Sequence, residues 1–244
     1  MITIESSSLL GFNIIDFYQF SLCSAIIIMV FHLISPYVET EKAKAWIITT
    51  LSSFILSLFG IHAVYRAEMY DLWTFDNVYG GEDSISRLVL IFFGATNIID
   101  LIIGSYYYPK YLDPFSTIAH HIFYISFITV LIGHHYSRGF ILCFLMEIPT
   151  FVLGIGRIWK ERRSDILFGL TFFITRLIYN IYLVNKLKNI ASEGIIWKIC
   201  LCVFLLHMYW FSKWYGNTGT QLQKRYSFTK LIGLKIKSPN TCEK

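Results

Sequence analysis

The sequence predicts an all-α membrane protein, a helical bundle of about seven transmembrane helices (six to eight) around a cavity that faces the cytoplasm. Of its 244 residues, 55% are hydrophobic and only 15% are charged, and its mean hydropathy is +0.54. Soluble globular domains carry about 25% charged residues. Apolar runs of membrane-spanning length, roughly 20 residues at about 1.5 Å rise each, recur along the whole chain.

These apolar runs give the predicted spans in order. They cover residues 12–38, 46–65, 85–108, 115–133, 140–158, 166–184 and 195–215. The second, fourth and sixth runs are short or polar at one end. The first eleven residues contain Glu5 but no Lys or Arg, so we expect the first run to remain as an anchor and not to be cleaved as a signal peptide.

The placement of Lys and Arg predicts the orientation of the spans. If the N-terminus lies outside, the inner side holds more than twice as many Lys and Arg residues as the outer side, so the C-terminus is predicted to be cytoplasmic. The basic surplus lies in the loop 157–163, "RIWKERR", and in the tail, where anionic lipid headgroups explain it without nucleic acid. Five cysteines show no CxxC pair, which argues against a zinc ribbon.

No internal repeat or long linker divides the chain, so we expect one integral membrane domain. Residues 1–45 form the N-terminal segment with the first span, residues 46–215 form the membrane domain, and residues 216–244 form a basic cytoplasmic tail.

Ionisable residues inside the predicted spans indicate a functional site, because each costs at least about 2.5–3.5 kcal/mol to insert at mid-membrane. Asp100, His120, Glu147 and His207 come from four different predicted spans. At about 1.5 Å per residue they lie roughly 8–16 Å below the inner surface. This agreement predicts one polar cavity that opens inward. A structural hydrogen bond between helices is the alternative for each residue taken alone. The six ionisable residues are Asp100, His120, His121, Glu147, Arg176 and His207.

The adjacent histidines favour a division of labour. Successive helical side chains diverge by about 100°, so His120 and His121 cannot easily hold one metal ion, and we expect no metal ligands. His120 shares a helix face with Tyr124, and His121 shares one with Thr117. One ring is therefore expected to act as a base or nucleophile while a neighbouring helix holds the other, and which ring faces the cavity stays open.

Two features of the later spans bear on Glu147. Pro149 removes a backbone donor, which predicts a kink two residues after Glu147. Arg176, with Asn180 one turn later, needs a counter-charge in the membrane, and Glu147 is the nearest in depth. A structural ion pair with Arg176 is thus the main rival to a catalytic role for Glu147.

The stretch "TNIIDLIIGSYYYPKYLDPFSTIAHHIFYISF", followed by "GFILCFLMEIPTF", resembles the TLC domain family of multi-span lipid proteins. In that family an acidic residue in one span precedes a His-His pair, as Asp100 precedes His120 and His121. A carboxylate follows in the next span, as Glu147 does.

Ceramide synthases of this family carry a longer signature, in which His-His is followed by Arg and Gly, then by His-Asp and a further Asp. The chain keeps Arg138 and Gly139, but it has Met146 and Glu147 in place of His-Asp and Thr150 in place of the last Asp. It is therefore more similar to the small TLC domain-containing proteins, which are linked to membrane lipid composition.

The resemblance implies a role in lipid metabolism or membrane lipid homeostasis at the endoplasmic reticulum. If the protein is an enzyme, it implies an acyl-CoA-dependent N- or O-acyltransferase that uses no bound cofactor, with acyl-CoA as co-substrate and a sphingoid base or other lipid as acceptor. A non-enzymatic lipid binder or regulator of membrane composition is the alternative. The expected catalytic residues are His120, His121, Glu147 and Asp100, and the expected substrate-binding residues are Asn97, Tyr124, Thr150, Arg176 and His207.

Overall fold

The computed structural model describes residues 12–80 and 83–231, and every regular element in these ranges is a helix. Six candidate membrane spans occur there, together with one shorter apolar helix, Thr117–Gly133. The predicted helical membrane bundle is confirmed. The six spans are Ile14–Tyr37, Glu41–Met69, Ser84–Tyr107, Ser137–Ile158, Asp165–Ile190 and Ile196–Gly216.

The helices follow the predicted runs closely, and several spans join segments of different helical type. Segments η4 and η7 are π-helical, and the other η segments are 3-10 turns. The elements up to the histidine pair are α1 (Ile14–Ile34), η2 (Ser35–Tyr37), α2 (Glu41–Lys44), α3 (Ile47–Met69), α4 (Phe75–Val78), α5 (Ser84–Tyr107), η3 (Pro109–Tyr111), η4 (Pro114–Ala119) and α6 (His120–Gly133). The later elements are α7 (Ser137–Ile141), η5 (Leu142–Glu147), α8 (Ile148–Ile158), η6 (Lys160–Arg162), α9 (Asp165–Phe172), η7 (Phe173–Ile178), α10 (Tyr179–Ile190) and α11 (Ile195–Leu231).

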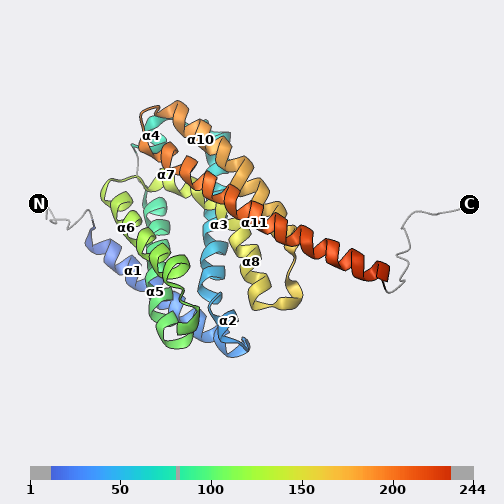
Figure 1. The fold of residues 1–244 in the computed structure, drawn as a ribbon. Coiled ribbons are helices and arrows are strands. Elements are labelled where there is room, and N and C mark those ends of the chain that lie inside the picture. Colours follow the sequence, from blue (N-terminus) through green and yellow to red (C-terminus); the bar gives the residue numbers. More distant parts are fainter. Residues whose placement is uncertain (1–11, 81–82, 232–244) are drawn as a thin grey trace, which may run out of the picture.

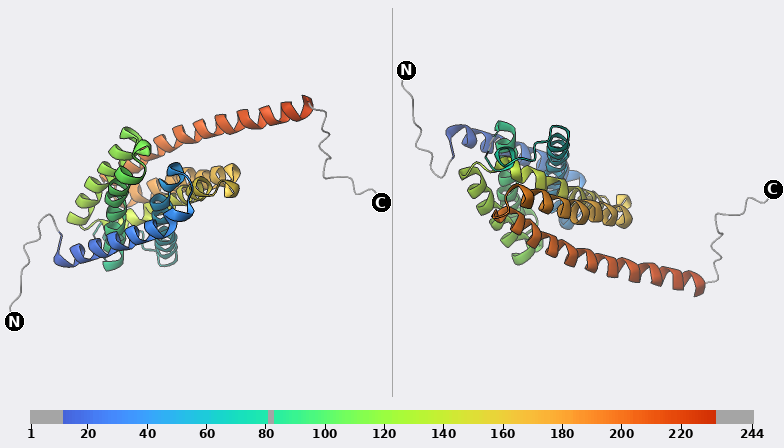
Figure 2. Two further views of the ribbon diagram at one scale, coloured as in Figure 1. Left: turned by 90° about the horizontal axis from the view of Figure 1, so that it is seen from below. Right: turned by 90° about the horizontal axis from the view of Figure 1, so that it is seen from above.

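Helix α3 lies at the centre of the bundle (Figure 1). It packs against η5 and α8, and also against α5, while α5 packs against α1 and α6, and α10 packs against α11. Both views in Figure 2 show α11 running along one side of the bundle and extending beyond the other helices. The first part of the predicted tail thus continues the last helix, whereas residues 232–244 lie outside the described residues.

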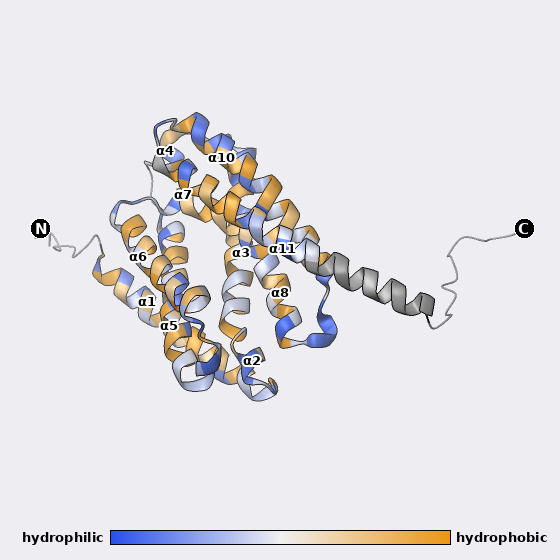
Figure 3. Ribbon diagram, in the orientation of Figure 1, coloured by the Kyte–Doolittle hydropathy of each residue, from blue (hydrophilic) through white to orange (hydrophobic). Residues whose placement is uncertain are grey.

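The bundle presents apolar side chains outward, as a protein surrounded by lipid must. Helix α1 exposes Phe17, Leu22, Met29 and Leu33 over more than half of each side chain's possible area. Figure 3 shows hydrophobic residues along most helices and hydrophilic ones concentrated in connections such as the loop after α8. This distribution is consistent with helices that cross a bilayer and loops that emerge from it.

A buried ion pair fastens α1 to α5. Arg87 donates from Nε to Asp16 Oδ1 at 2.7 Å and from Nη2 to Asp16 Oδ2 at 2.7 Å. Asp16 also accepts a hydrogen bond from the backbone N–H of Asn13, which completes a capping box at the start of α1. Charge counting from the sequence treats Arg87 as a loop residue, whereas the structure buries it.

Small residues allow the central helices to approach closely. A Cβ atom added at Gly60 in α3 would collide with the backbone of Phe144 and Leu145 in η5, and one at Gly154 in α8 would collide with Thr50 Oγ1. Close backbone approach at small residues is a main source of helix association in membranes, where van der Waals packing replaces the hydrophobic effect.

Substitution of Gly60 by alanine is expected to destabilise the fold by about 1–3 kcal/mol, because the added methyl meets backbone atoms that cannot rotate away. Thermal unfolding of the purified protein in detergent measures the effect. Gly94→Ala is the matched control, since a Cβ there meets only Ile128 Cγ2 at 3.8 Å. Equal melting temperatures for the two variants would contradict the assigned contact.

Candidate functional site

Three of the predicted ionisable residues, His120, Glu147 and Arg176, lie in or next to segments that depart from regular α geometry. The π-helical η4 leads directly into His120, the 3-10 segment η5 ends at Glu147, and the π-helical η7 contains Arg176. Pro149 explains one of these departures: it has no N–H to donate to Leu145 O, which instead accepts from the N–H of Ile148. The structure thus has a 3-10 segment immediately before Pro149, while α8 continues from Ile148 to Ile158.

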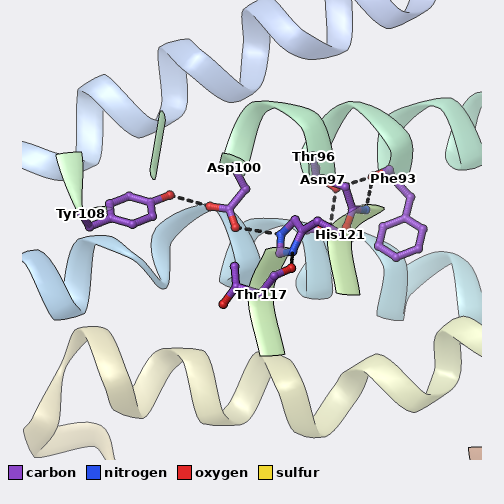
Figure 4. Close-up of polar contacts among 8 residues, drawn as sticks. Phe93, Thr96, Asn97, Asp100, Tyr108, Thr117 and His121 are labelled. Carbon is purple, nitrogen blue, oxygen red and sulfur yellow. Dashed lines mark hydrogen bonds and ion pairs between the residues drawn. The ribbon is translucent and has the colours of Figure 1, made fainter. Parts of the chain in front are cut away.

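His121 is held at both ring nitrogens, as Figure 4 shows. Its Nε2 lies 2.9 Å from Asp100 Oδ2, and its Nδ1 lies 2.7 Å from the backbone carbonyl oxygen of Thr117. A carbonyl oxygen only accepts hydrogen bonds, so Nδ1 carries a proton and donates it. Both nitrogens are therefore occupied, and His121 has no lone pair available for a substrate.

Tyr108 completes this arrangement, and the sequence analysis did not include it among the candidate site residues. Its Oη donates to Asp100 Oδ1 at 2.5 Å, and both Tyr108 and Asp100 are buried (Figure 4). Tyr108 lies two helical turns after Asp100, a spacing that could have identified it, but it stands at the predicted end of its span. Together Tyr108, Asp100, His121 and Thr117 form what we call the His121 clamp.

Tyr108→Phe is expected to weaken the His121 clamp by removing one donor to a buried carboxylate, a loss of about 1–3 kcal/mol. Thermal unfolding of the variant measures this loss. Tyr107→Phe is the control, because the Tyr107 hydroxyl makes no hydrogen bond among the described contacts of that exposed residue. An unchanged melting temperature for Tyr108→Phe would show that the clamp does not depend on Tyr108.

His120 differs sharply from its neighbour. Its side chain is exposed, and no described residue hydrogen-bonds to its ring nitrogens. The ring packs edge-on against Tyr124, with centroids 4.7 Å apart, as the shared helix face predicts. Glu147 and Arg176 lie close enough to act electrostatically on it. Of the two histidines, His120 is the one with a nitrogen lone pair open to a ligand.

Arg176 joins the polar segments of two later spans. It donates from Nε to the carbonyl oxygen of Met146 at 2.8 Å and from Nη2 to Thr150 Oγ1 at 2.7 Å. Its Nη2 also lies 3.7 Å from Glu147 Oε1. The ion pair that rivals a catalytic Glu147 is present, although its separation is longer than that of a direct charge-assisted hydrogen bond.

Of the remaining predicted residues, His207 lies near the contacts of Arg176, whereas Asn97 takes no part in them. Asn180 Nδ2 and His207 Nδ1 lie 3.4 Å apart, and His207 is also an electrostatic neighbour of Arg176. Asn97 instead donates to the carbonyl oxygen of Phe93 in its own helix at 2.7 Å (Figure 4). The structure therefore forms one polar group around His121 and Asp100 and a second around Arg176 and Glu147, while the amide of Asn97 binds its own backbone.

A cavity of about 260 Å³ adjoins the polar group around Arg176. It lies between α8, α9, η7 and α11, with Arg176 and Thr150 as its polar wall. The histidines and Asp100 do not line it, so the predicted single cavity around all the polar residues is only partly realised. The lining residues are Thr150, Leu153, Phe168, Phe172, Arg176, Trp210 and Trp214.

Arg138 and Gly139 have a structural role at the opposite end of the bundle. Arg138 Nε donates to Asp83 Oδ2 at 2.9 Å, and a Cβ at Gly139 would lie 2.7 Å from the carbonyl oxygen of Val78. Burial alone would raise the pKa of Asp83, but hydrogen bonds from Ser86 and Arg138 outweigh it and hold that pKa below its ordinary value. The Arg-Gly pair thus fastens α7 to α4 and to the start of α5.

Comparison with known proteins gives one match. The family model described as TLC domain matches residues 42–215, which include the His121 clamp, His120 and the Arg176 network. No curated protein and no solved structure matches the chain significantly. TLC domain proteins are associated with membrane lipid metabolism and homeostasis. Because the match covers well over half of a chain whose six candidate spans make it a multi-pass membrane protein, the chain belongs to the TLC domain family.

Proposed function

We propose that the protein is an acyltransferase that moves the acyl group of acyl-CoA to the amine or hydroxyl of a membrane lipid, with His120 as the nucleophile. The observation that supports this role is the contrast between the two rings. His121 is saturated by Asp100 and Thr117, whereas His120 keeps a free lone pair beside Glu147 and Arg176. A nucleophile needs such a lone pair, and its neighbours can stabilise the charges that develop.

In the proposed reaction, the unprotonated nitrogen of His120 attacks the thioester carbonyl carbon of acyl-CoA. The carbon–sulfur bond breaks, the proton on the other ring nitrogen passes to the thiolate, and CoA leaves as a thiol. The acceptor's amine or hydroxyl then attacks the acyl-imidazole, the bond to His120 breaks, and the acceptor's proton returns to the ring. No external oxidant or metal ion is needed for this sequence.

The surrounding groups have distinct roles in this proposal. The positive charge of Arg176 stabilises the oxyanion formed at the carbonyl, and Glu147 orients Arg176 and the attacking acceptor. The His121 clamp fixes the helix that carries His120. The apolar cavity next to Arg176 accommodates part of the acyl chain or of the acceptor lipid, since its walls are mainly aromatic and aliphatic.

Acyl-CoA approaches from the cytoplasm in this proposal. The C-terminal end of α5, η4 and the end of α8 lie toward the end of the bundle that carries the loop 159–163 (Figure 1). There Lys160, Arg162 and Arg163 can attract CoA phosphates. In this proposal that loop and the C-terminus lie in the cytoplasm, as the distribution of Lys and Arg predicts. We propose the endoplasmic reticulum as the location, because acyl-CoA and lipid acceptors meet at its membrane.

The test uses the purified full chain in detergent or nanodiscs. Incubation with palmitoyl-CoA alone is expected to give a covalent mass increase of one palmitoyl group, measured on the intact protein and mapped to His120 by peptide analysis. Addition of sphingoid bases or lysolipids is expected to discharge that group with release of CoA thiol. Absence of both acylation and CoA release, across acyl chain lengths and acceptors, would exclude the proposal.

Lipid binding without chemistry is the second candidate, and the cavity favours it. Five of its seven lining residues are apolar, and Arg176 and Thr150 hydrogen-bond to each other across its polar wall. A lipid held there needs no reaction at His120. In that case the protein retains a lipid through purification, Arg176→Met reduces retention, and acyl-CoA is not turned over.

A further inference from the structure

Two aromatic rings form perpendicular walls at the end of the bundle opposite the loop 159–163. Trp73 follows α3 and Tyr182 belongs to α10, and their ring centroids are 5.9 Å apart with an interplanar angle of 87°. Figure 1 shows that α10 reaches this end beside α4, where the connection after α3 also lies. The rings come from distant parts of the sequence and meet only in the folded chain.

A positive charge stands in front of both rings. Lys186 Nζ lies 5.1 Å from the centroid of Trp73 and 5.4 Å from that of Tyr182. A cation within about 6 Å of a ring face gains about 0.5–1 kcal/mol at an exposed site and more when it loses water. The two rings therefore create one place where a cation is stabilised twice.

Glu68, at the end of α3, fixes the two walls and adds negative charge. Its Oε1 accepts a hydrogen bond from Trp73 Nε1 at 2.9 Å and another from Tyr182 Oη. The polar hydrogens of both rings are thus directed at Glu68, and the Lys186 ammonium group contacts the faces of the rings. We call Glu68, Trp73 and Tyr182 the cation cage.

The chemistry of the cation cage selects for a quaternary ammonium group. A primary ammonium is strongly hydrated and seeks hydrogen-bond acceptors, of which Glu68 Oε1 is already engaged twice. A trimethylammonium group makes no hydrogen bonds and needs only ring faces and negative charge. Lys186 reaches the cage through a flexible four-carbon stem, so its ammonium group can leave without any movement of the helix.

We propose that the cation cage binds the choline group of a membrane phospholipid, and that Lys186 fills it when no headgroup is bound. The occupant is a lipid because the cage lies where α3 and α10 end, at the level where spans emerge among headgroups. The proposal is independent of acyl transfer, since none of these four residues belongs to the histidine site.

The experiment measures which lipids the protein retains. The purified full chain is equilibrated in mild detergent with equimolar dioleoyl phosphatidylcholine, phosphatidylethanolamine and phosphatidylglycerol, and bound lipids are counted by native mass spectrometry. Phosphatidylcholine is expected to exceed phosphatidylethanolamine by about threefold or more, in line with one added cation–π contact. Equal retention of these two lipids by the unmutated protein would overturn the proposal.

Variants assign the preference to the cage. Trp73→Ala is expected to equalise the two lipids, and Lys186→Gln is expected to raise phosphatidylcholine retention because the competing cation is gone. Lys188→Gln is the matched control: Lys188 Nζ lies 5.5 Å from the Trp197 ring and over no second ring among the described residues, so the ratio should stay unchanged. If Trp73→Ala does not fold, Glu68→Gln at an exposed side chain serves instead. A preference that survives either variant would place the lipid elsewhere.

Discussion

His120→Ala is expected to lower the rate of acyl transfer by at least about 10²–10⁴-fold, because the variant loses the nucleophile itself and that range is typical for the loss of a positioned proton-transfer group alone. Its melting temperature is expected to change little, because the His120 ring is exposed and packs mainly against Tyr124. His121→Ala is expected to lower both activity and melting temperature, because the buried Asp100 carboxylate loses its partner at Oδ2 and keeps only the hydrogen bond from Tyr108 among the described contacts. Release of CoA thiol and thermal unfolding, measured on the same preparations, separate the two roles.

A control histidine makes this comparison specific. His62 lies on an exposed face of α3, so His62→Ala is expected to retain both the rate and the melting temperature. Acyl transfer at the unmutated rate in His120→Ala, together with loss of transfer in His121→Ala, would reverse the assignment and make His121 the reacting ring.

Arg87→Met is expected to lower the free energy of unfolding by about 3–5 kcal/mol, since it leaves the Asp16 carboxylate buried without its counter-charge. Asp16 is 2% exposed and receives two hydrogen bonds from Arg87, each 2.7 Å long. The loss should be largest in the packing of α1 against α5, because this ion pair joins those helices. Chemical denaturation in detergent, with hydrogen exchange to locate the loosened helix, measures it.

The double variant Asp16→Asn, Arg87→Met tests whether the unpaired Asp16 carboxylate causes the loss of stability. It removes both charges, and the asparagine side-chain oxygen can still accept from the N–H of Asn13 at the helix cap. Most of the lost stability is expected to return, because replacement of a whole buried ion pair costs far less than removal of one partner. If the double variant is as unstable as Arg87→Met, the ion pair is not the cause of the loss.

The membrane spans could be predicted because a segment enters lipid only if nearly all of its own residues are apolar, and that property can be read from the segment itself. The predicted run 85–108 and the observed α5 at Ser84–Tyr107 differ by one residue at each end. The short fourth run was also predicted as one of the weaker spans, and the structure makes it the shorter apolar helix Thr117–Gly133. The Asp16–Arg87 pair was missed, because both residues stand near the ends of their runs and resemble loop charges.

The ionisable residues of the candidate site could be chosen from the sequence, but the contacts among them could not. The cost of ionisable groups identified Asp100, both histidines, Glu147 and Arg176. Which histidine is engaged depends on the π-helical turn before His120 and on the reach of Tyr108, and neither follows from spacing alone. The cation cage was invisible for a similar reason, because Trp73 and Tyr182 become neighbours only when α3 and α10 pack.

The shortness of the apolar helix Thr117–Gly133 affects the lipids around it. At about 1.5 Å per residue it rises about 26 Å, less than the roughly 30 Å thickness of a typical hydrocarbon core. Acyl tails beside it must compress to cover the hydrophobic mismatch, which thins the bilayer locally. Headgroups and water then lie closer to this helix than they would in an unthinned bilayer, which shortens the distance that acyl-CoA travels to His120 in the proposed reaction.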